Sequence, residues 1–259
     1  MAYIESRFEN HIGTITMSHA EHRNALSETL INEMIQAFET MKEAKARVII
    51  LRAHPGAKVW SAGHDVKELP TPGRDPLGYE DSLVRVLRTV QYLTIPVIAM
   101  IDGSVWGGAC DLAFTCDILI GSPAAQFTMT PAKLGVPYNA SGLLRFMNIL
   151  GVNAAKEMFF TAQPIPSEHA YRLGILNHLV PAESLESFTY DLAEKISRNS
   201  PLSIAAMKES FRLLANASPL TPNMFERIQG LRRKVYDSND YREGIQSFLE
   251  KRPPVFKGE

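Results

Sequence analysis

The amino-acid sequence predicts an α/β fold in which buried strands are covered by helices. Residues 47–53, 95–101 and 117–120 form short continuous apolar runs, and such runs, when rich in β-branched residues, are typical of strands covered on both faces. An amphipathic helical pattern precedes the first run, so strands and helices alternate over the first two-thirds of the chain. Beyond about residue 140 several helical patterns follow one another, and we expect the C-terminal third to be mostly helical.

The first predicted elements are a pair of strands and a helix. Side chains alternate over residues 13–18, which indicates a strand, and residues 3–8 are expected to pair with it through a turn at 10–13. Ser27 is a suitable N-cap residue. Apolar residues then recur at spacings of three and four between residues 30 and 41. This spacing predicts a helix that ends before the lysine-rich residues 42–47.

The C-terminal helical patterns are separated by clear breaks. Helical periodicity marks residues 143–149, 185–196, 202–214 and 241–249, and breaks lie at Gly151, Pro201, Pro219 and Pro222. We therefore divide the chain into a core of residues 1–195 and a helical C-terminal region of residues 196–259.

Composition and charge exclude several classes of protein. The chain has 259 residues, and its 27 basic and 28 acidic side chains give a formal net charge of −1, so bulk charge suggests neither a nucleic-acid partner nor a membrane partner. The N-terminal residues contain no signal-peptide core, and the longest apolar stretches are too short to span a membrane. We expect a cytoplasmic protein. Cys110 and Cys116 are six residues apart, a spacing that favours buried, reduced thiols over a disulfide framework.

No metal site is expected from the histidines. The seven histidines form neither an H-x-x-x-H nor an H-E-x-x-H pattern, which are the spacings that place two ligands on one helix face. His19 and His22 lie in a stretch without a partner set of carboxylates.

Two glycine-containing turns each follow a predicted buried strand. Residues 61–65 (SAGHD) follow the first apolar run, and residues 104–109 (SVWGGA) follow the second. A helix that opens at Gly108 leaves N–H groups unpaired at the positive end of its dipole, which suits an anion or a developing oxyanion. On this pattern alone, tight turns without a function remain the alternative.

Five segments resemble the successive signature blocks of the crotonase (enoyl-CoA hydratase/isomerase) superfamily, in order and in spacing, over nearly the whole chain. They are residues 23–26 (RNAL), 60–65 (WSAGHD), 102–113 (DGSVWGGACDLA), 116–118 (CDI) and 134–137 (LGVP). The resemblance implies a crotonase-type spiral of repeated ββα units that carries an acyl-CoA site within residues 1–195. It also implies a helical C-terminal trimerisation region, and hence a homo-oligomer that is a trimer or a dimer of trimers.

In that superfamily two backbone N–H groups hold the carbonyl oxygen of a CoA thioester. By motif position these are the N–H groups of His64 and Gly108, so the resemblance implies that both residues are catalytic. Donors fixed in this way stabilise negative charge as it develops on the oxygen, and one such donor is worth roughly 3–4 kcal/mol. No cofactor is expected, because CoA is part of the substrate.

The positions that activate water in hydratases of the superfamily are changed in this chain. Those enzymes use two glutamates, and the matching positions here hold Asp111 and Pro131. A glutamate about 5 Å from a substrate carboxylate would repel it by roughly 3 kcal/mol at an effective dielectric constant near 20. Loss of the pair therefore suits a substrate with an anionic acyl group.

Further segments resemble the members of the superfamily that decarboxylate methylmalonyl-CoA. These segments are residues 73–77, 104–108, 129–131, 134–139, 225–230 and 248–252. They imply a lyase that converts methylmalonyl-CoA, or a related malonyl-type thioester, to propionyl-CoA through a thioester enolate. Tyr138 is then a third catalytic residue, whose hydroxyl orients the substrate carboxylate. The implied contacts with the acyl-CoA are Ala25, Ala62, Gly63, His64, Asp65, Val66, Gly108, Thr130 and Lys251.

Two other functions remain open on the sequence. One is hydration or isomerisation of an enoyl-CoA, with Asp111 as a single acid/base. The other is a non-catalytic homologue that binds acyl-CoA or RNA, for which the candidate basic surface is Arg227, Arg232, Arg233 and Lys234. Plainer interpretations also exist, because Tyr138 can be a half-buried aromatic residue and Lys251 a solvated charge.

Overall fold

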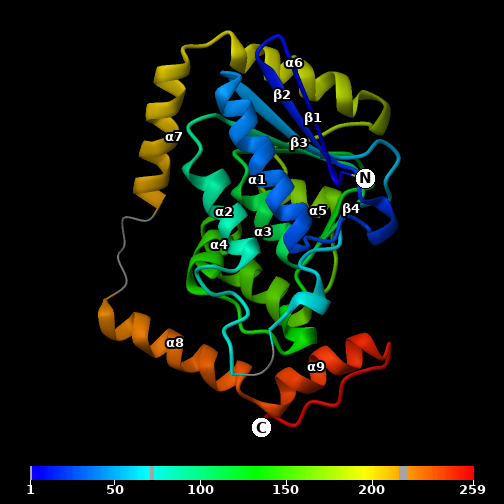
Figure 1. Ribbon diagram of the computed structural model, residues 1–259, viewed down its shortest axis with the longest axis vertical. Coiled ribbons are helices and arrows are strands. Elements are labelled where there is room, and N and C mark those ends of the chain that lie inside the picture. The colour runs from blue at the N-terminus through cyan, green and yellow to red at the C-terminus, as the bar shows by residue number, and fades with distance from the viewer. Residues whose placement is uncertain (1, 71–72, 216–220) are drawn as a thin grey trace.

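The computed structural model describes residues 2–70, 73–215 and 221–259 (Figure 1). In this part of the chain the larger sheet has six strands, in the order β1-β2-β3-β5-β7-β10. β1 and β2 form an antiparallel hairpin, and each later strand is parallel to its neighbour. The strands are β1 (Ile4–Glu9), β2 (Ile12–Met17), β3 (Val48–Ala53), β5 (Val97–Ile101), β7 (Ile118–Gly121) and β10 (His178–Leu179). The predicted α/β class is confirmed.

A smaller sheet gives the fold its spiral form. Its strands, in the order in which they pair, are β4 (Val59–Ser61), β6 (Ser104–Trp106), β8 (Gln126–Thr128) and β9 (Ile165–Pro166). β3 leads to β4 and then to helix α2, β5 leads to β6 and α3, and β7 leads to β8 and α4. Each ββα unit lays its two strands parallel to those of the unit before it. The chain therefore coils as the expected spiral of ββα units.

Helices cover the larger sheet on both faces. α1 packs against β1, β2 and α2, and α6 lies across β2, β3, β5 and β7. Ser27 caps α1, because its Oγ accepts a hydrogen bond from the Leu30 N–H at 3.3 Å. The helices of the core are α1 (Glu28–Glu43), α2 (Ser82–Tyr92), α3 (Gly108–Thr115), α4 (Ala140–Thr161), α5 (Ser167–Arg172) and α6 (Leu185–Ser197).

Short 3-10 turns and buried polar contacts connect these layers. The turns are η1 (Ala20–His22), η2 (Val66–Glu68), η3 (Pro131–Leu134) and η4 (Ala182–Ser184). Trp60 is fully buried between the two sheets, and its indole N–H donates to the Met100 carbonyl at 3.0 Å. Cys110 and Cys116 are buried free thiols, as the sequence predicts, and burial raises the pKa of both.

The C-terminal region is helical. It contains α7 (Pro201–Ala215), α8 (Pro222–Tyr236) and α9 (Asn239–Leu249), and α8 and α9 lie below the body in Figure 1. α9 packs directly on η3, since a Cβ on Gly244 would lie 2.2 Å from the Leu134 carbonyl oxygen. The predicted boundary between residues 195 and 196 falls in the last turn of α6. Pro219, a predicted break, lies outside the described residues.

Candidate active site

A cavity of about 570 Å³ lies where the two glycine turns, η3 and α9 meet. It collects residues that are far apart in the sequence, because successive ββα units bring their strand ends to one place. Eight of the predicted site residues line it, namely Ala25, Ala62, His64, Asp65, Val66, Gly108, Thr130 and Tyr138. Gly63 lies within the first turn, and Lys251 is an exposed residue just after α9 that is not among the lining residues.

The first turn is fixed by hydrogen bonds to the segment at residues 23–26. The Asn24 side-chain amide donates to the Trp60 carbonyl at 3.1 Å, and the Ser61 hydroxyl donates to the Asn24 carbonyl at 2.6 Å. The Leu26 N–H donates to the Gly63 carbonyl at 2.8 Å. These bonds hold the backbone around His64 before any ligand binds.

The two predicted N–H donors lie beside each other. A Cβ on Gly63, whose φ is +85°, would lie 2.4 Å from the Trp106 carbonyl oxygen and 3.1 Å from the Gly108 nitrogen. A Cβ on Gly108 would lie 3.5 Å from the His64 nitrogen. Only glycine permits this approach of the two turns. No acceptor in the described part of the chain takes a hydrogen bond from the N–H of His64 or of Gly108. The pair is therefore free to bind an oxygen atom of a ligand.

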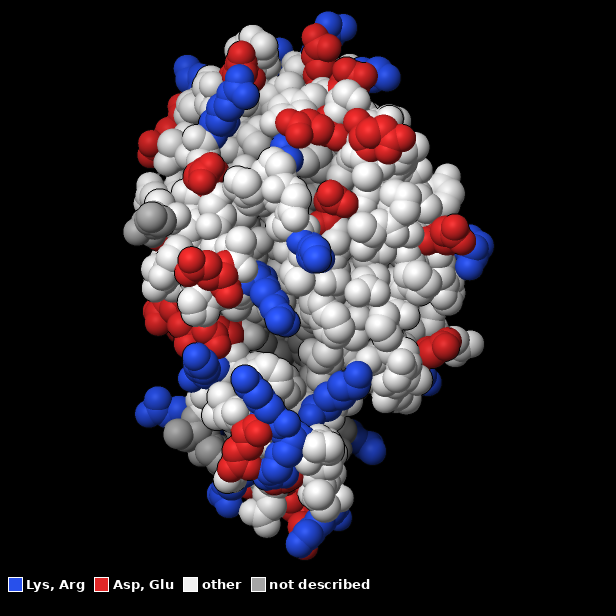
Figure 2. All heavy atoms as spheres, turned by 90° about the vertical axis from the view of Figure 1, so that its right-hand side faces the viewer, with Lys and Arg blue, Asp and Glu red and all other residues white. Residues whose placement is uncertain are grey.

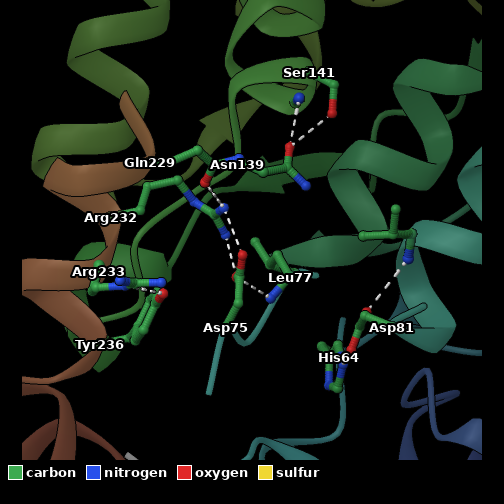
Figure 3. A network of polar contacts seen from close by, with 12 residues as sticks. His64, Asp75, Leu77, Asp81, Asn139, Ser141, Gln229, Arg232, Arg233 and Tyr236 are labelled. Carbon is green, nitrogen blue, oxygen red and sulfur yellow. Dashed lines mark hydrogen bonds and ion pairs between the residues drawn. The ribbon is translucent and has the colours of Figure 1, made fainter. Parts of the chain in front are cut away.

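The imidazole of His64 is held by acceptors of the protein (Figure 3). Its Nδ1 lies 3.1 Å from the Asp65 carbonyl oxygen, and its Nε2 lies 3.3 Å from Oδ2 of Asp81. Burial by itself lowers the pKa of His64, but the hydrogen bond and the charge of Asp81 outweigh it, so the pKa is raised above 6.5. In the protonated ring both N–H groups donate to these acceptors, so the ring fixes the turn that carries the His64 N–H.

Asp81→Asn is expected to destabilise the protein in a pH-dependent way. A raised His64 pKa contributes stability that is fully present below the unfolded-state pKa of about 6.5 and is lost as pH rises through the folded-state pKa. Asparagine keeps the N-cap acceptor of α2, where Oδ1 of Asp81 accepts from the N–H groups of Leu83 and Val84. We expect a loss of about 1–2 kcal/mol near pH 6 that shrinks towards pH 9, measured by urea unfolding. A loss independent of pH would contradict this account.

Tyr138 lines the cavity, but its hydroxyl donates a hydrogen bond to another residue of the protein. Its hydroxyl donates to Oδ2 of Asp111 at 2.7 Å, and the Arg145 guanidinium pairs with the other oxygen of Asp111. Burial, followed by the neighbouring charge of Asp111, raises the pKa of Tyr138 well above 10. From the sequence we expected this hydroxyl to hold a substrate carboxylate, whereas in the structure its hydrogen bond is already made inside the protein.

The two positions at which hydratases carry glutamates hold no pair of carboxylates that could activate water in this chain. Asp111 is 1% exposed, both of its oxygens are engaged, and it is not among the lining residues. Pro131 lines the cavity at the second position and offers no titratable group. This arrangement weighs against the alternative in which Asp111 is a single acid/base.

Several lining residues were missed from the sequence. Arg23, Lys67 and Lys133 give the cavity three cationic side chains, and Asp65 is the one acidic residue among the described lining residues. The sequence holds no signal for this grouping, because the three cations belong to separate segments that only the spiral brings together. An excess of positive charge suits a ligand that carries phosphate groups.

The C-terminal helix α8 is tied to the loop that forms one wall of the cavity (Figure 3). The Arg232 guanidinium makes a two-pronged ion pair with Asp75, with Nη1 2.8 Å from Oδ2. Oδ1 of Asp75 also accepts from the Leu77 N–H at 2.9 Å, and Leu77 lines the cavity. Two segments singled out in the sequence, 73–77 and 225–230, therefore belong to one contact region, since Gln229 also binds Arg232 at 2.9 Å.

The candidate basic surface on α8 is not a uniform stripe. Arg232 is 5% exposed and is used in the ion pair with Asp75. Figure 2 shows Lys and Arg side chains gathered over the lower end of the molecule, where α8 and α9 lie in Figure 1, with Asp and Glu side chains among them. In the described part of the chain every helix is too short or too polar to span a membrane, and no cluster of His, Cys, Asp and Glu there could hold a metal ion.

Comparison with protein families gives one match over almost the whole chain. Residues 7–259 match the enoyl-CoA hydratase/isomerase family. Methylmalonyl-CoA decarboxylase of Escherichia coli (strain K12) is 46% identical over 249 residues, which cover 96% of this chain and 95% of that protein. The mitochondrial enoyl-CoA hydratase of Pongo abelii is 32% identical over 258 residues, covering 96% and 84% of the two chains.

Solved structures give the same order of similarity. A methylmalonyl-CoA decarboxylase complexed with 2S-carboxypropyl-CoA has a TM-score of 0.97 at 45% identity, covering 100% of this chain and 99% of that one. The same kind of enzyme in complex with 2-nitronate-propionyl-CoA also has a TM-score of 0.97 at 45% identity, covering 99% of each chain. An enoyl-CoA hydratase subunit from Geobacillus kaustophilus has a TM-score of 0.76 at 29% identity, covering 99% and 98%.

Proposed function

Because the chain belongs to the enoyl-CoA hydratase/isomerase family and matches methylmalonyl-CoA decarboxylase over nearly its full length, we propose that it decarboxylates methylmalonyl-CoA to propionyl-CoA. One observation carries this function. The adjacent, unpaired N–H groups of His64 and Gly108 lie beside a cavity from which a water-activating carboxylate pair is missing, because Asp111 is engaged elsewhere and Pro131 takes the other position.

The reaction uses the two N–H groups to hold the thioester oxygen. When the bond between C2 and the carboxylate carbon breaks, its electron pair moves into the thioester and the negative charge appears on that oxygen. Donors fixed in advance stabilise this charge without reorganising, and the loss of one costs roughly 3–4 kcal/mol. The breaking bond must stand perpendicular to the thioester plane, so the cavity walls have to hold the acyl group in that conformer.

Tyr138 is the third catalytic residue of this proposal, because it lines the cavity together with the Gly108 turn and residues of η3. Its ring edge restricts how the substrate carboxylate can rotate. The raised pKa of its hydroxyl makes Tyr138 a poor acid, so in this scheme Tyr138 is not the source of the proton that converts the enolate into propionyl-CoA.

CoA binding draws on the cationic lining residues and on the first turn. Arg23, Lys67 and Lys133 suit the phosphates of CoA, and residues 62–66 with Ala25 and Thr130 suit its pantetheine chain and thioester. The chemistry needs no cofactor beyond the CoA of the substrate, because the thioester itself accepts the electrons.

The assembly proposed for this enzyme is a homotrimer or a dimer of trimers in the cytoplasm. Large apolar side chains are exposed along the C-terminal helices, among them Leu202, Phe211, Leu214 and Leu231, which are 61–83% exposed. Exposed apolar surface of this kind is typical of an interface. In the assembly, Lys251 would reach the CoA of a neighbouring subunit.

The direct test is product analysis with two substrates. Purified protein is incubated with methylmalonyl-CoA, and released CO2 and propionyl-CoA are measured, while a parallel reaction follows hydration of crotonyl-CoA. We expect CO2 and propionyl-CoA in equal amounts and hydration at least about a hundredfold slower, since a hydratase needs the missing acid/base pair, whose contribution is about 10²–10⁴-fold. Faster hydration than decarboxylation would favour the hydratase alternative. The absence of both reactions would favour a non-catalytic binding protein.

A further inference from the structure

The side chain of Tyr138 borders the cavity while its hydroxyl bonds in another direction. The hydroxyl lies 2.7 Å from Oδ2 of Asp111, and Asp111, at 1% exposure, is not among the residues that line the cavity. Arg145 approaches from α4 and pairs with Oδ1 of the same carboxylate. Only 9% of the Tyr138 surface is exposed. Tyr138 thus contributes to the cavity lining while its hydroxyl is hydrogen-bonded to the buried Asp111.

Counting protons fixes the direction of these hydrogen bonds. A phenol has one proton to donate, a carboxylate only accepts, and a guanidinium only donates. Tyr138 and Arg145 therefore both donate to Asp111, one to each oxygen. A second carboxylate, brought by the substrate, finds no proton on the Tyr138 oxygen unless the bond to Asp111 is first broken.

We propose that Asp111 and Arg145 are positioning residues that hold the Tyr138 proton away from the substrate, so that the reacting carboxylate lies against Tyr138 without a hydrogen bond from it. The inference rests on the proposed decarboxylation and deepens it. Asp111 holds the proton, Arg145 holds Asp111 in place, and Tyr138 presents its ring edge to the carboxylate.

Withholding this proton favours the reaction because of where the charge moves. The substrate begins with its negative charge on the carboxylate and ends with that charge on the thioester oxygen, next to the N–H groups of His64 and Gly108. A donor at the carboxylate stabilises the substrate more than the transition state, in which CO2 is already losing its charge, and so slows the chemical step. Contacts to the distant CoA portion can offset the unfavourable placement of the carboxylate.

Asp111→Asn reverses the arrangement without changing the shape of the side chain. The Arg145 guanidinium, a donor only, turns the new amide oxygen towards itself. The amide nitrogen then faces the Tyr138 oxygen and donates to it, which releases the phenol proton towards the cavity. The substitution therefore converts Tyr138 from a residue that withholds a proton into one that donates it to the substrate carboxylate.

The first measurement is ligand binding, which does not depend on turnover. The probes are 2-carboxypropyl-CoA, which carries the carboxylate but has no thioester to accept electrons, and propionyl-CoA, which lacks the carboxylate. Isothermal titration calorimetry is expected to show that Asp111→Asn binds 2-carboxypropyl-CoA about tenfold more tightly than the parent does, with propionyl-CoA affinity unchanged within about twofold. In Asp111→Asn/Tyr138→Phe the gain should disappear, because the phenol proton is gone.

The second measurement separates kcat from KM with methylmalonyl-CoA. For Asp111→Asn we expect kcat to fall at least about tenfold while KM also falls, which is the pattern of relieved ground-state strain. In Asp111→Asn/Tyr138→Phe the released proton is absent, so kcat should recover at least about threefold over Asp111→Asn. Tyr138→Phe alone, which keeps the test valid if Asp111→Asn folds poorly, should lower kcat by less than about tenfold.

Defined results would overturn the inference. A fall in kcat of more than about tenfold for Tyr138→Phe would show that the hydroxyl donates to the substrate in the reaction. Equal losses of affinity for both ligands in Asp111→Asn would reduce Asp111 to a packing residue. If the parent binds 2-carboxypropyl-CoA and the variant tightens it, but no CO2 is released from methylmalonyl-CoA, then the proposed function fails while the arrangement of Tyr138, Asp111 and Arg145 stands.

Discussion

Gly108→Pro is expected to lower kcat for decarboxylation by at least about a hundredfold, or ~2.7 kcal/mol. Proline has no N–H, so one of the two proposed donors is lost. The fold should survive, because Gly108 is the first residue of α3 and proline is well tolerated at that helix position. Single-turnover release of CO2 from methylmalonyl-CoA measures the effect on the chemical step.

Gly108→Ala is the matched control for the missing N–H group. Both substitutions add a Cβ, which at this position would lie 2.6 Å from Cδ2 of Leu83 and must push that flexible side chain aside. Alanine keeps the N–H, so any loss shared by the two variants is steric and the excess loss in Gly108→Pro belongs to the donor. Equal activity of the alanine and proline variants would remove the Gly108 N–H from the mechanism.

Arg232→Met is expected to cost about 2 kcal/mol of folding stability and to raise KM. The substitution keeps much of the buried side-chain volume but leaves Asp75 without its ion-pair partner, next to the Leu77 N–H that it also binds. Because Leu77 lines the cavity, a loosened loop should weaken substrate binding as well. Urea unfolding and steady-state kinetics measure the two effects separately.

Variants of Arg233 and Asp75 provide the controls for the ion pair between Arg232 and Asp75. Arg233→Met removes a charge from the exposed side of the same helix and should change stability by no more than about 0.5 kcal/mol. In Arg232→Met/Asp75→Leu neither charge remains, so the double variant should be more stable than Arg232→Met alone. If the double variant is the less stable of the two, the ion pair does not connect α8 to the loop.

The sequence predicted the buried strands and the first helix because local patterns decide them. The apolar run at 95–101 became β5, and the capped periodic segment after Ser27 became α1. α2 and α8 were not identified, for different reasons. α2 has the spacing of an amphipathic helix, with Leu83, Val86, Leu87 and Val90 buried, and this pattern was missed. α8 buries only Arg232 and Tyr236 among its residues, so its apolar pattern is weak. Gly151, a predicted break, is a kink with φ +73° inside α4.

Only those residues of the candidate site that belong to sequence motifs were predicted. The resemblance to the family, confirmed by the comparisons, led to His64, Gly108 and Tyr138, whose side chains or backbone border one cavity. The pairing of Tyr138 with Asp111 was not predicted, because the two residues are far apart in the sequence, and Arg145, which binds the same carboxylate, belongs to no motif. The direction of a hydrogen bond depends on the three-dimensional neighbours of both groups, which no spacing along the chain encodes.

The central claim is that the N–H groups of His64 and Gly108 stabilise a thioester enolate. The most direct measurement compares the affinities of the parent, Gly108→Ala and Gly108→Pro for the nitronate of 2-nitropropionyl-CoA, a planar anionic mimic of that enolate, and for propionyl-CoA. We expect the parent and Gly108→Ala to prefer the nitronate by at least about a hundredfold, and Gly108→Pro to lose most of this preference. Equal binding of the two ligands by the parent, or a preference that survives in Gly108→Pro, would contradict the claim.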